Sequence, residues 1–188
     1  MMARAQTSAA TAERILDAAV DVSWELPTDK ISLDEVARRA GVTVQTVIRR
    51  FGGRDALFTA AGARESERIR GQRDEAIPGA PASAVGALLD HYEVFGDRVL
   101  KMLAEEERNP ALRSVVDQGR TVHRDWCARV FAAALAPTRG LKRERRLAQF
   151  VAICDVYTWK LLRRDAALSR SQSELALVEL LNPLLEES

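Results

Sequence analysis

The sequence has few of the residues that build sheets, disulfide frameworks or membrane spans. Only 5% of its 188 residues are Phe, Trp or Tyr, and it contains two cysteines, Cys127 and Cys154. Two cysteines without metal-ligand spacing fit a reducing compartment better than a disulfide framework. No apolar run reaches the roughly 18 residues of a membrane helix, and the start, MMARAQTSAATAERI, lacks the apolar core of a secretion signal. We therefore expect a cytoplasmic protein that makes no membrane contact.

Motifs of common enzymes and cofactor sites are missing as well. There is no HExxH, no GxGxxG, no Walker-type loop and no paired-cysteine motif. His123 and Cys127 have the i, i+4 spacing of a nucleophile with its base, but no orienting group accompanies them. A metal site built from His91, Glu105 to Glu107 and His123 is equally unsupported. We expect no catalysis, no cofactor and no metal.

A large net charge is also absent, because the sequence has 28 basic and 27 acidic residues and a net charge of +1. Any binding to nucleic acid must therefore come from a local patch. Residues 36–54 form such a patch, since they include no acidic residue and carry five arginines: Arg38, Arg39, Arg49, Arg50 and Arg54. Contacts of such side chains with phosphates would make binding dependent on salt.

Helix-forming residues are abundant, and no segment alternates with period two for long enough to be a strand. The prolines and glycine of Ile77-Pro78-Gly79-Ala80-Pro81 suggest a boundary between residues 1–76 and 77–188. Capping boxes at Ser32/Glu35 and Ser171/Glu174 mark two helix starts. We expect an all-α protein of about nine helices, with a break possible at Gly96, over 9–25, 32–41, 43–51, 54–75, 83–107, 109–135, 141–165 and 171–183.

The stretch SLDEVARRAGVTVQTVIRRFGGRDAL, residues 32–57, meets the demands of a helix-turn-helix. Val36 and Ala40 face inward, and Ala37 is small enough for a second helix to cross closely over it. Gly41 stands in the turn, where a positive φ is needed. Three apolar residues anchor the second helix on the inside: Val42, Val47 and Phe51.

The opposite face of this second helix is the face that a recognition helix presents to the major groove. Gln45 has the donor and acceptor that suit adenine, and Val44 can pack on a thymine methyl group. Arginine guanidinium groups and threonine hydroxyls can reach phosphates. The residues expected to contact DNA are Thr43, Val44, Gln45, Thr46, Ile48, Arg49, Arg50 and Arg54.

Residues 31–57 resemble the TetR (tetracycline-repressor-like) family of bacterial transcriptional regulators. That family couples an Ala-Gly-Val turn to a threonine-rich recognition helix, a Phe, and a basic-acidic-Ala-Leu opening of the next helix. The positions that match are Val36-Ala37, Ala40-Gly41-Val42-Thr43, Thr46-Val47, Phe51 and Arg54-Asp55-Ala56-Leu57. Ile48 departs from the usual aromatic, Gln45 from a small residue and Gly52 from a proline, and these departures bear on the operator sequence.

The resemblance implies a three-helix DNA-binding domain over 1–76, joined by a long fourth helix to a helical bundle over 77–188. It also implies a homodimer through the last two helices, about 141–165 and 171–185. The apolar residues of these helices, which exceed what one core needs, favour the same interface. The expected function is repression from a palindromic double-stranded DNA operator, with release by a small-molecule effector.

The effector site is the least determined part of the sequence. Aromatic, polar-tipped and soft side chains of the kind that line ligand pockets are spread over the second domain, although each can equally pack the core. The candidates are His91, Tyr92, Phe95, Met102, His123, Trp126 and Tyr157. The alternative function is a helical interaction module that has lost DNA binding, which Ile48 and the near-neutral charge leave open.

Overall fold

The structure is a computed structural model that describes residues 2–26, 30–74, 76–108 and 110–186. All regular elements in these ranges are helical, which confirms the all-α prediction. The chain divides into two compact units, 1–68 and 69–188, and the second is the larger. No helix in the described ranges combines the length and apolar character needed to cross a membrane.

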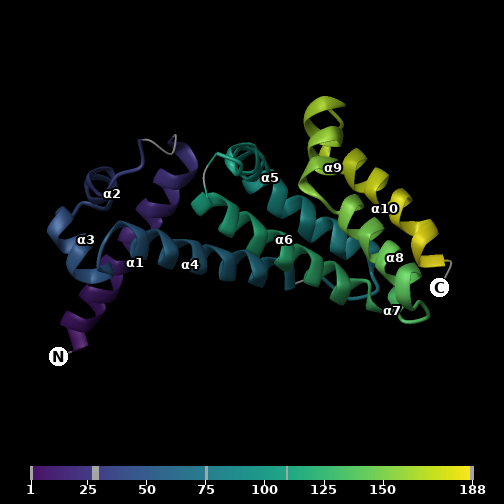
Figure 1. Ribbon diagram of the computed structural model, residues 1–188, viewed down its shortest axis with the longest axis horizontal. Helices are drawn as coiled ribbons and strands as arrows, with labels where there is room; N and C mark the ends of the chain where they lie inside the picture. The colour runs from purple at the N-terminus through teal and green to yellow at the C-terminus, as the bar shows by residue number, and fades with distance from the viewer. Residues whose placement is uncertain (1, 27–29, 75, 109, 187–188) are drawn as a thin grey trace. The chain divides into compact units, whose positions relative to one another are not determined.

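The first unit packs its helices around one small apolar core. It contains α1 (Met2–Glu25), α2 (Leu33–Ala40), α3 (Val44–Phe51) and most of α4 (Arg54–Asp74), shown from purple to blue in Figure 1. α1 packs directly against α2, and α2 against α3. The fully buried side chains of this core are Ile15, Ala19, Val22, Val36, Val47 and Leu57.

Local signals place the ends of α2 and α3 where the sequence predicts them. The Ser32 hydroxyl accepts a hydrogen bond from the Glu35 backbone N–H (3.2 Å), which caps α2. Gly41 ends α2 with φ +65°, the positive value that its place in the turn requires. Thr43 then caps α3 through the backbone N–H of Thr46 (3.2 Å). The two helices are thereby held in a fixed turn.

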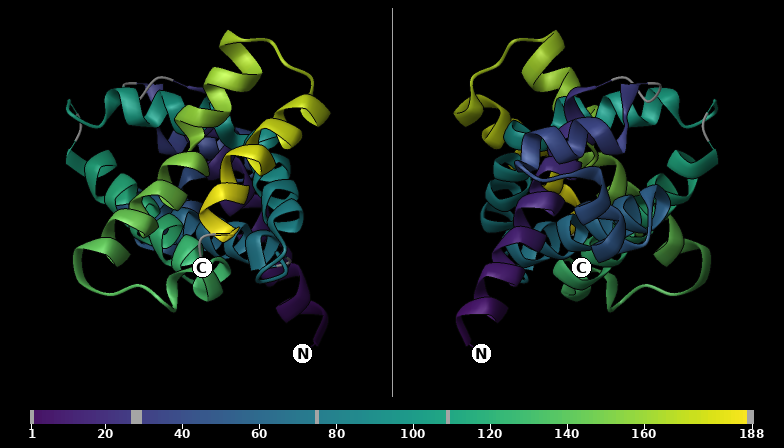
Figure 2. Two further views of the ribbon diagram at one scale, coloured as in Figure 1. Left: turned by 90° about the vertical axis from the view of Figure 1, so that its right-hand side faces the viewer. Right: turned by 90° about the vertical axis from the view of Figure 1, so that its left-hand side faces the viewer.

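The second unit is a helical bundle with its own core. Its elements are α5 (Pro81–Glu105), α6 (Pro110–Val130), α7 (Ala132–Leu135), α8 (Gly140–Ile153), α9 (Val156–Lys160), the π-helix η2 (Leu161–Asp165) and α10 (Arg170–Glu186). α10 packs against both α5 and α8, and α6 packs against α8. Figure 1 and the two views of Figure 2 show α10 in yellow alongside α8 in green.

Gly96 does not break the helix that contains it, because α5 runs without interruption from Pro81 to Glu105. The glycine is needed for packing instead. A Cβ built on Gly96 would lie 2.4 Å from Cζ3 of the fully buried Trp159. The missing side chain therefore makes room for the largest residue of the core.

The predicted helix over 141–165 is divided in two. α8 ends at Ile153, and Asp155 caps the following α9 by accepting a hydrogen bond from the Tyr157 N–H (2.9 Å). The chain then continues as the π-helix η2. The sequence has no Gly or Pro at this break to predict it, and the cap is a single aspartate inside an apolar stretch.

Two predictions for the last helix are wrong. α10 is capped by Ser169, whose hydroxyl accepts from the Gln172 N–H (3.2 Å), and not by the Ser171/Glu174 box. Pro183 lies inside the helix, which continues to Glu186, and does not end it. The carbonyl of Leu184 accepts a hydrogen bond from the Arg146 guanidinium of α8, so tertiary contacts support the turn beyond the proline.

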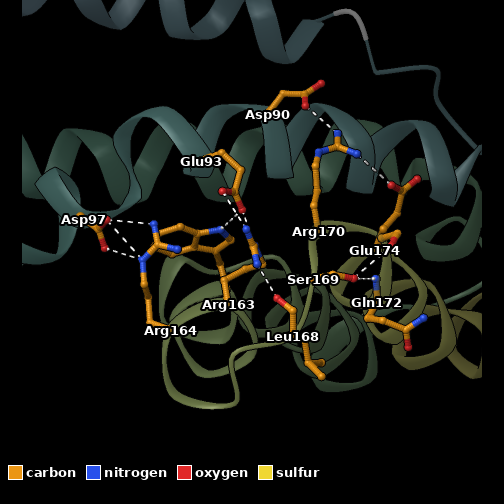
Figure 3. Close-up of polar contacts among 12 residues, drawn as sticks. Asp90, Glu93, Asp97, Arg163, Arg164, Leu168, Ser169, Arg170, Gln172 and Glu174 are labelled. Atoms are coloured by element: carbon orange, nitrogen blue, oxygen red, sulfur yellow. Dashed lines mark hydrogen bonds and ion pairs between the residues drawn. The ribbon is translucent and has the colours of Figure 1, made fainter.

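A stripe of three carboxylates on α5 faces three arginines that follow α9 (Figure 3). Asp90, Glu93 and Asp97 pair with Arg170, Arg163 and Arg164, respectively, at N···O distances of 2.6, 2.5 and 2.9 Å. Glu93 also accepts from the Trp159 indole N–H (3.3 Å). The stripe fixes η2 and the start of α10 against α5.

Candidate nucleic-acid interface

α3 has one buried side and one exposed side. Val47 is fully buried in the core of the first unit, and Phe51 packs against the same core. Gln45 and Arg49 are exposed, and Ile48 is 38% exposed. The predicted outward residues therefore share a solvent-facing side of a helix whose other side is anchored.

The other residues that we predict to contact DNA at α3 differ in how far their side chains are exposed. Thr43 is exposed, and its hydroxyl lies 3.0 Å from that of the half-buried Thr46. Val44 is half-buried and packs partly against the core. Arg50 donates to the hydroxyl of Ser8 in α1 (2.8 Å), which withdraws part of its guanidinium from solvent.

The basic patch is partly neutralised from within. Glu35 accepts two hydrogen bonds from Arg38 (2.7 and 2.8 Å) and one from Arg39 (2.8 Å). These bonds, from Arg38 first and then Arg39, lower the pKa of Glu35 to about 2. Arg39 also pairs with Glu25 of α1 (2.6 Å). Arg39 therefore ties α2 to α1, whereas Arg38 pairs within its own helix.

Arg49 and Arg54 remain the more available cations. The Arg49 guanidinium makes no hydrogen bond or ion pair with the rest of the described chain. Arg54 lies 3.7 Å from the Asp55 carboxylate and 5.5 Å from the centre of the Phe58 ring. Its Nη2 also donates weakly to the carbonyl of Ile31 (3.5 Å). A phosphate would compete easily with such loose contacts.

The predicted effector residues fall into separate environments in the second unit. The rings of His91, Tyr92 and Phe95 are buried on α5, with His91 5.2 Å from each of the other two. His123 and Trp126 are buried on α6 with their rings stacked at 6.1 Å. Met102 is half-buried, and Tyr157 is 54% exposed.

Sequence reasoning missed the ion pairs of Glu35 and the buried position of Arg73. Glu35 was recognised as a capping residue, although its i+3 and i+4 spacing to Arg38 and Arg39 also predicts the ion pairs. Arg73 was not singled out. It is 5% exposed, and its guanidinium lies 5.5 Å from the Tyr92 ring and 5.6 Å from the Trp126 ring. Nothing in the local sequence marks Arg73 as buried.

Comparison with known proteins agrees with this geometry. Residues 15–61 match the family model of bacterial regulatory proteins, tetR family. This match begins in α1 and ends in α4, so it contains the whole helix-turn-helix. A search among curated proteins gives no match.

Solved structures extend the likeness to nearly the whole fold. A transcriptional regulator from Rhodococcus sp. Rha1 has a TM-score of 0.68 at 22% identity, over 94% of this chain and 96% of that one. A TetR-family transcriptional regulator from Rhodococcus sp. has 0.66 at 18%, over 93% and 98%. A transcriptional regulator from Streptomyces coelicolor A3(2) has 0.60 at 20%, over 90% and 97%. Residues 15–61 therefore match the tetR family model across the whole helix-turn-helix, and the fold of the chain is similar to that of solved transcriptional regulators.

Proposed function

We propose that the protein is a cytoplasmic repressor that binds a palindromic operator as a homodimer and is released by a small-molecule effector. The observation that carries the DNA-binding part is the outward side of α3. There Gln45, Ile48 and Arg49 are exposed while Val47 is fixed in the core. A helix anchored in this way can enter the major groove without rearranging, with Gln45 reading bases and Arg49 contacting phosphates.

Exposed leucines support a dimer through the last helices. Leu141 of α8 is 80% exposed, and Leu161, Leu175 and Leu180 are each about half exposed or more. The same helices already fill their own core with Phe150, Leu177 and Leu181. The surplus apolar surface is best covered by an equivalent surface of a second copy. Two copies would present two α3 helices to half-sites about 34–36 Å apart, or somewhat more.

The effector proposal rests on the aromatic residues of the second unit. His91, Tyr92, Phe95, His123 and Trp126 offer apolar faces with polar edges, as residues of ligand pockets do. We propose that an apolar or aromatic effector binds among them, with Met102 and Tyr157 nearer the surface. Such an effector must bind the released state more tightly than the DNA-bound state, typically by ~1–3 kcal/mol.

Selection of bound sequences from a random duplex library, together with the mass of the protein in solution, tests this proposal. We expect a dimer that enriches an inverted repeat. Gene expression from a promoter carrying that repeat then distinguishes repression from activation. If no sequence is enriched at any salt concentration, the proposal fails and the chain is better described as an interaction module.

A further inference from the structure

The two cysteines of the chain belong to the same buried core of the second unit. Cys127 belongs to α6, and Cys154 follows the last residue of α8, where the chain leaves the helix. Their exposed fractions are 0% and 1%, and both are free thiols. A hydrogen bond between the two thiols lowers the pKa of Cys127 and raises that of Cys154. The two thiols therefore differ in acidity, and Cys127 is the one that loses its proton first.

His123 connects Cys127 to a buried cation. Arg73 can only donate, so its Nη1 donates to Nδ1 of His123 (3.2 Å) and this nitrogen carries no proton. The ring proton is then on Nε2, which lies 3.3 Å from the Val151 carbonyl and 3.9 Å from the Cys127 sulfur. The imidazole N–H is thus shared between the Val151 carbonyl and, at longer range, the Cys127 sulfur, so it can turn to donate to a thiolate when one forms.

A negative charge near Arg73 would compensate the buried charge of its guanidinium. Arg73 is buried between aromatic rings and has no carboxylate within ion-pair distance in the described chain. Its Nε has no hydrogen-bond partner there. Asp155, next to Cys154, uses its carboxylate to cap Tyr157. Because a buried charge is costly when it is uncompensated, an anion on Cys127 is favoured in this cluster.

We propose that Cys127 and Cys154 form a peroxide-reactive site that closes to a disulfide between α6 and the end of α8. The Cys127 thiolate attacks one oxygen of a hydroperoxide, the O–O bond breaks, and the leaving oxygen takes a proton to become water or an alcohol. The resulting sulfenic acid is attacked by the Cys154 sulfur. The S–S bond forms and the sulfenic oxygen leaves as water. Two thiols are oxidised for each hydroperoxide reduced.

The burial of the pair selects the oxidant. A bulky disulfide needs a wider local opening to reach either sulfur than hydrogen peroxide does, because hydrogen peroxide is small and uncharged. Cys154 lies at the break between α8 and α9, held there by the Tyr92 hydroxyl, which donates to the Cys154 carbonyl (3.1 Å). Local opening of such a helix end is less costly than opening the core. We therefore assign hydrogen peroxide and small alkyl hydroperoxides as the reagents of this site.

The test uses the full reduced protein without DNA, so it does not depend on the proposed function. The protein is treated with hydrogen peroxide or, separately, with glutathione disulfide, then unfolded and alkylated, and its free thiols are counted by mass. With peroxide we expect loss of both thiols, a Cys127–Cys154 linked peptide pair, and recovery on reduction. Glutathione disulfide should react more slowly by about tenfold or more.

Variants separate the roles of the groups. Cys154→Ser should stop at a Cys127 sulfenic acid that dimedone traps, whereas Cys127→Ser should react slowly. Arg73→Gln should slow the loss of thiols, and the matched control Arg124→Gln, an exposed position on α6, should not. The proposal is overturned if both wild-type thiols stay alkylatable after peroxide, or if Cys127→Ser is oxidised as fast as wild type.

Discussion

At the scale of single residues, we expect the outward side of α3 to divide into side chains that contact bases and side chains that contact phosphates. Gln45 is exposed and lies at the N-terminal end of the helix, where base contacts concentrate. Ile48 in the middle is exposed and could make only apolar contacts. Specificity is therefore expected to depend on Gln45 more than on any other single side chain of this helix.

We predict that Gln45→Ala weakens binding to the selected operator by ~1–3 kcal/mol and leaves binding to random DNA unchanged. The physical reason is the loss of a bidentate contact with one base. Titration of both duplexes with the variant and with Gln118→Ala, an exposed glutamine of α6, measures the difference. Equal weakening on both duplexes would remove Gln45 from base reading.

Two glycines of the first unit should respond oppositely to the same substitution. Gly41 has φ +65°, and Gly62 lies inside α4, and a Cβ on either meets no atom within 4 Å. Gly41→Ala should therefore destabilise by ~1–2 kcal/mol through backbone strain alone. Gly62→Ala should stabilise by about 0.5–1 kcal/mol because alanine loses less entropy in a helix. Chemical denaturation of both variants measures the change in the free energy of unfolding. If both variants change it in the same direction, the reasoning is wrong.

At the scale of elements, the carboxylate of Glu35 and two arginines one turn further on stabilise α2 from within. Because the folded pKa of Glu35 is about 2 and the ordinary value is 4.5, its contribution to stability is complete above pH 4.5 and is lost as pH falls through 2. Glu35→Gln should lower stability at neutral pH and approach wild type at the acid end. Thermal unfolding across this range tests it, with Glu67→Gln, an exposed glutamate of α4, as control. If the stability of Glu35→Gln differs from that of wild type by the same amount at all pH values, the prediction is wrong.

The stripe in Figure 3 gives a prediction for η2. Glu93 is partly buried and accepts from both Trp159 and Arg163, so Glu93→Ala should cost ~1–3 kcal/mol. Asp97 is mostly exposed and, among the described residues, pairs only with Arg164, so Asp97→Ala should cost about 1 kcal/mol or less. Urea unfolding of the two variants gives the comparison. A larger loss for Asp97→Ala would mean that the outer pair, and not Glu93, holds this segment.

The sequence predicts most elements because their signals are local. Ser32 and Gly41 act on their own turn, and they were placed correctly. Ser169 and Ser171 are two competing caps within three residues, and only the packed structure chooses Ser169. Gly96 resembles a helix breaker until the Trp159 ring that fills its space is known. In the candidate site, the exposed side of α3 follows from helical spacing, but the bond between Arg39 and Glu25 joins residues of different helices and has no local signal.

At the scale of the whole molecule, assembly is expected to depend on α10. Leu175 is half exposed on this helix, and in a symmetric dimer one substitution appears twice. Leu175→Asp should raise the dimer dissociation constant about tenfold or more, which is about 1.4 kcal/mol. Sedimentation measures this, with Val94→Asp, an exposed position of α5, as the matched control. An unchanged dissociation constant for Leu175→Asp would place the interface elsewhere.

The three tryptophans give each part of the molecule its own optical reporter. Trp24 is in α1, Trp126 stacks on His123 beside the thiol pair, and Trp159 lies under the Arg164 guanidinium at 4.3 Å. Indole emission shifts with the polarity of its surroundings, so single-tryptophan variants would separate signals from the three places. Melting of the helix-turn-helix, oxidation of the cysteines and loosening of η2 could then be followed in one protein, by light alone and without labels.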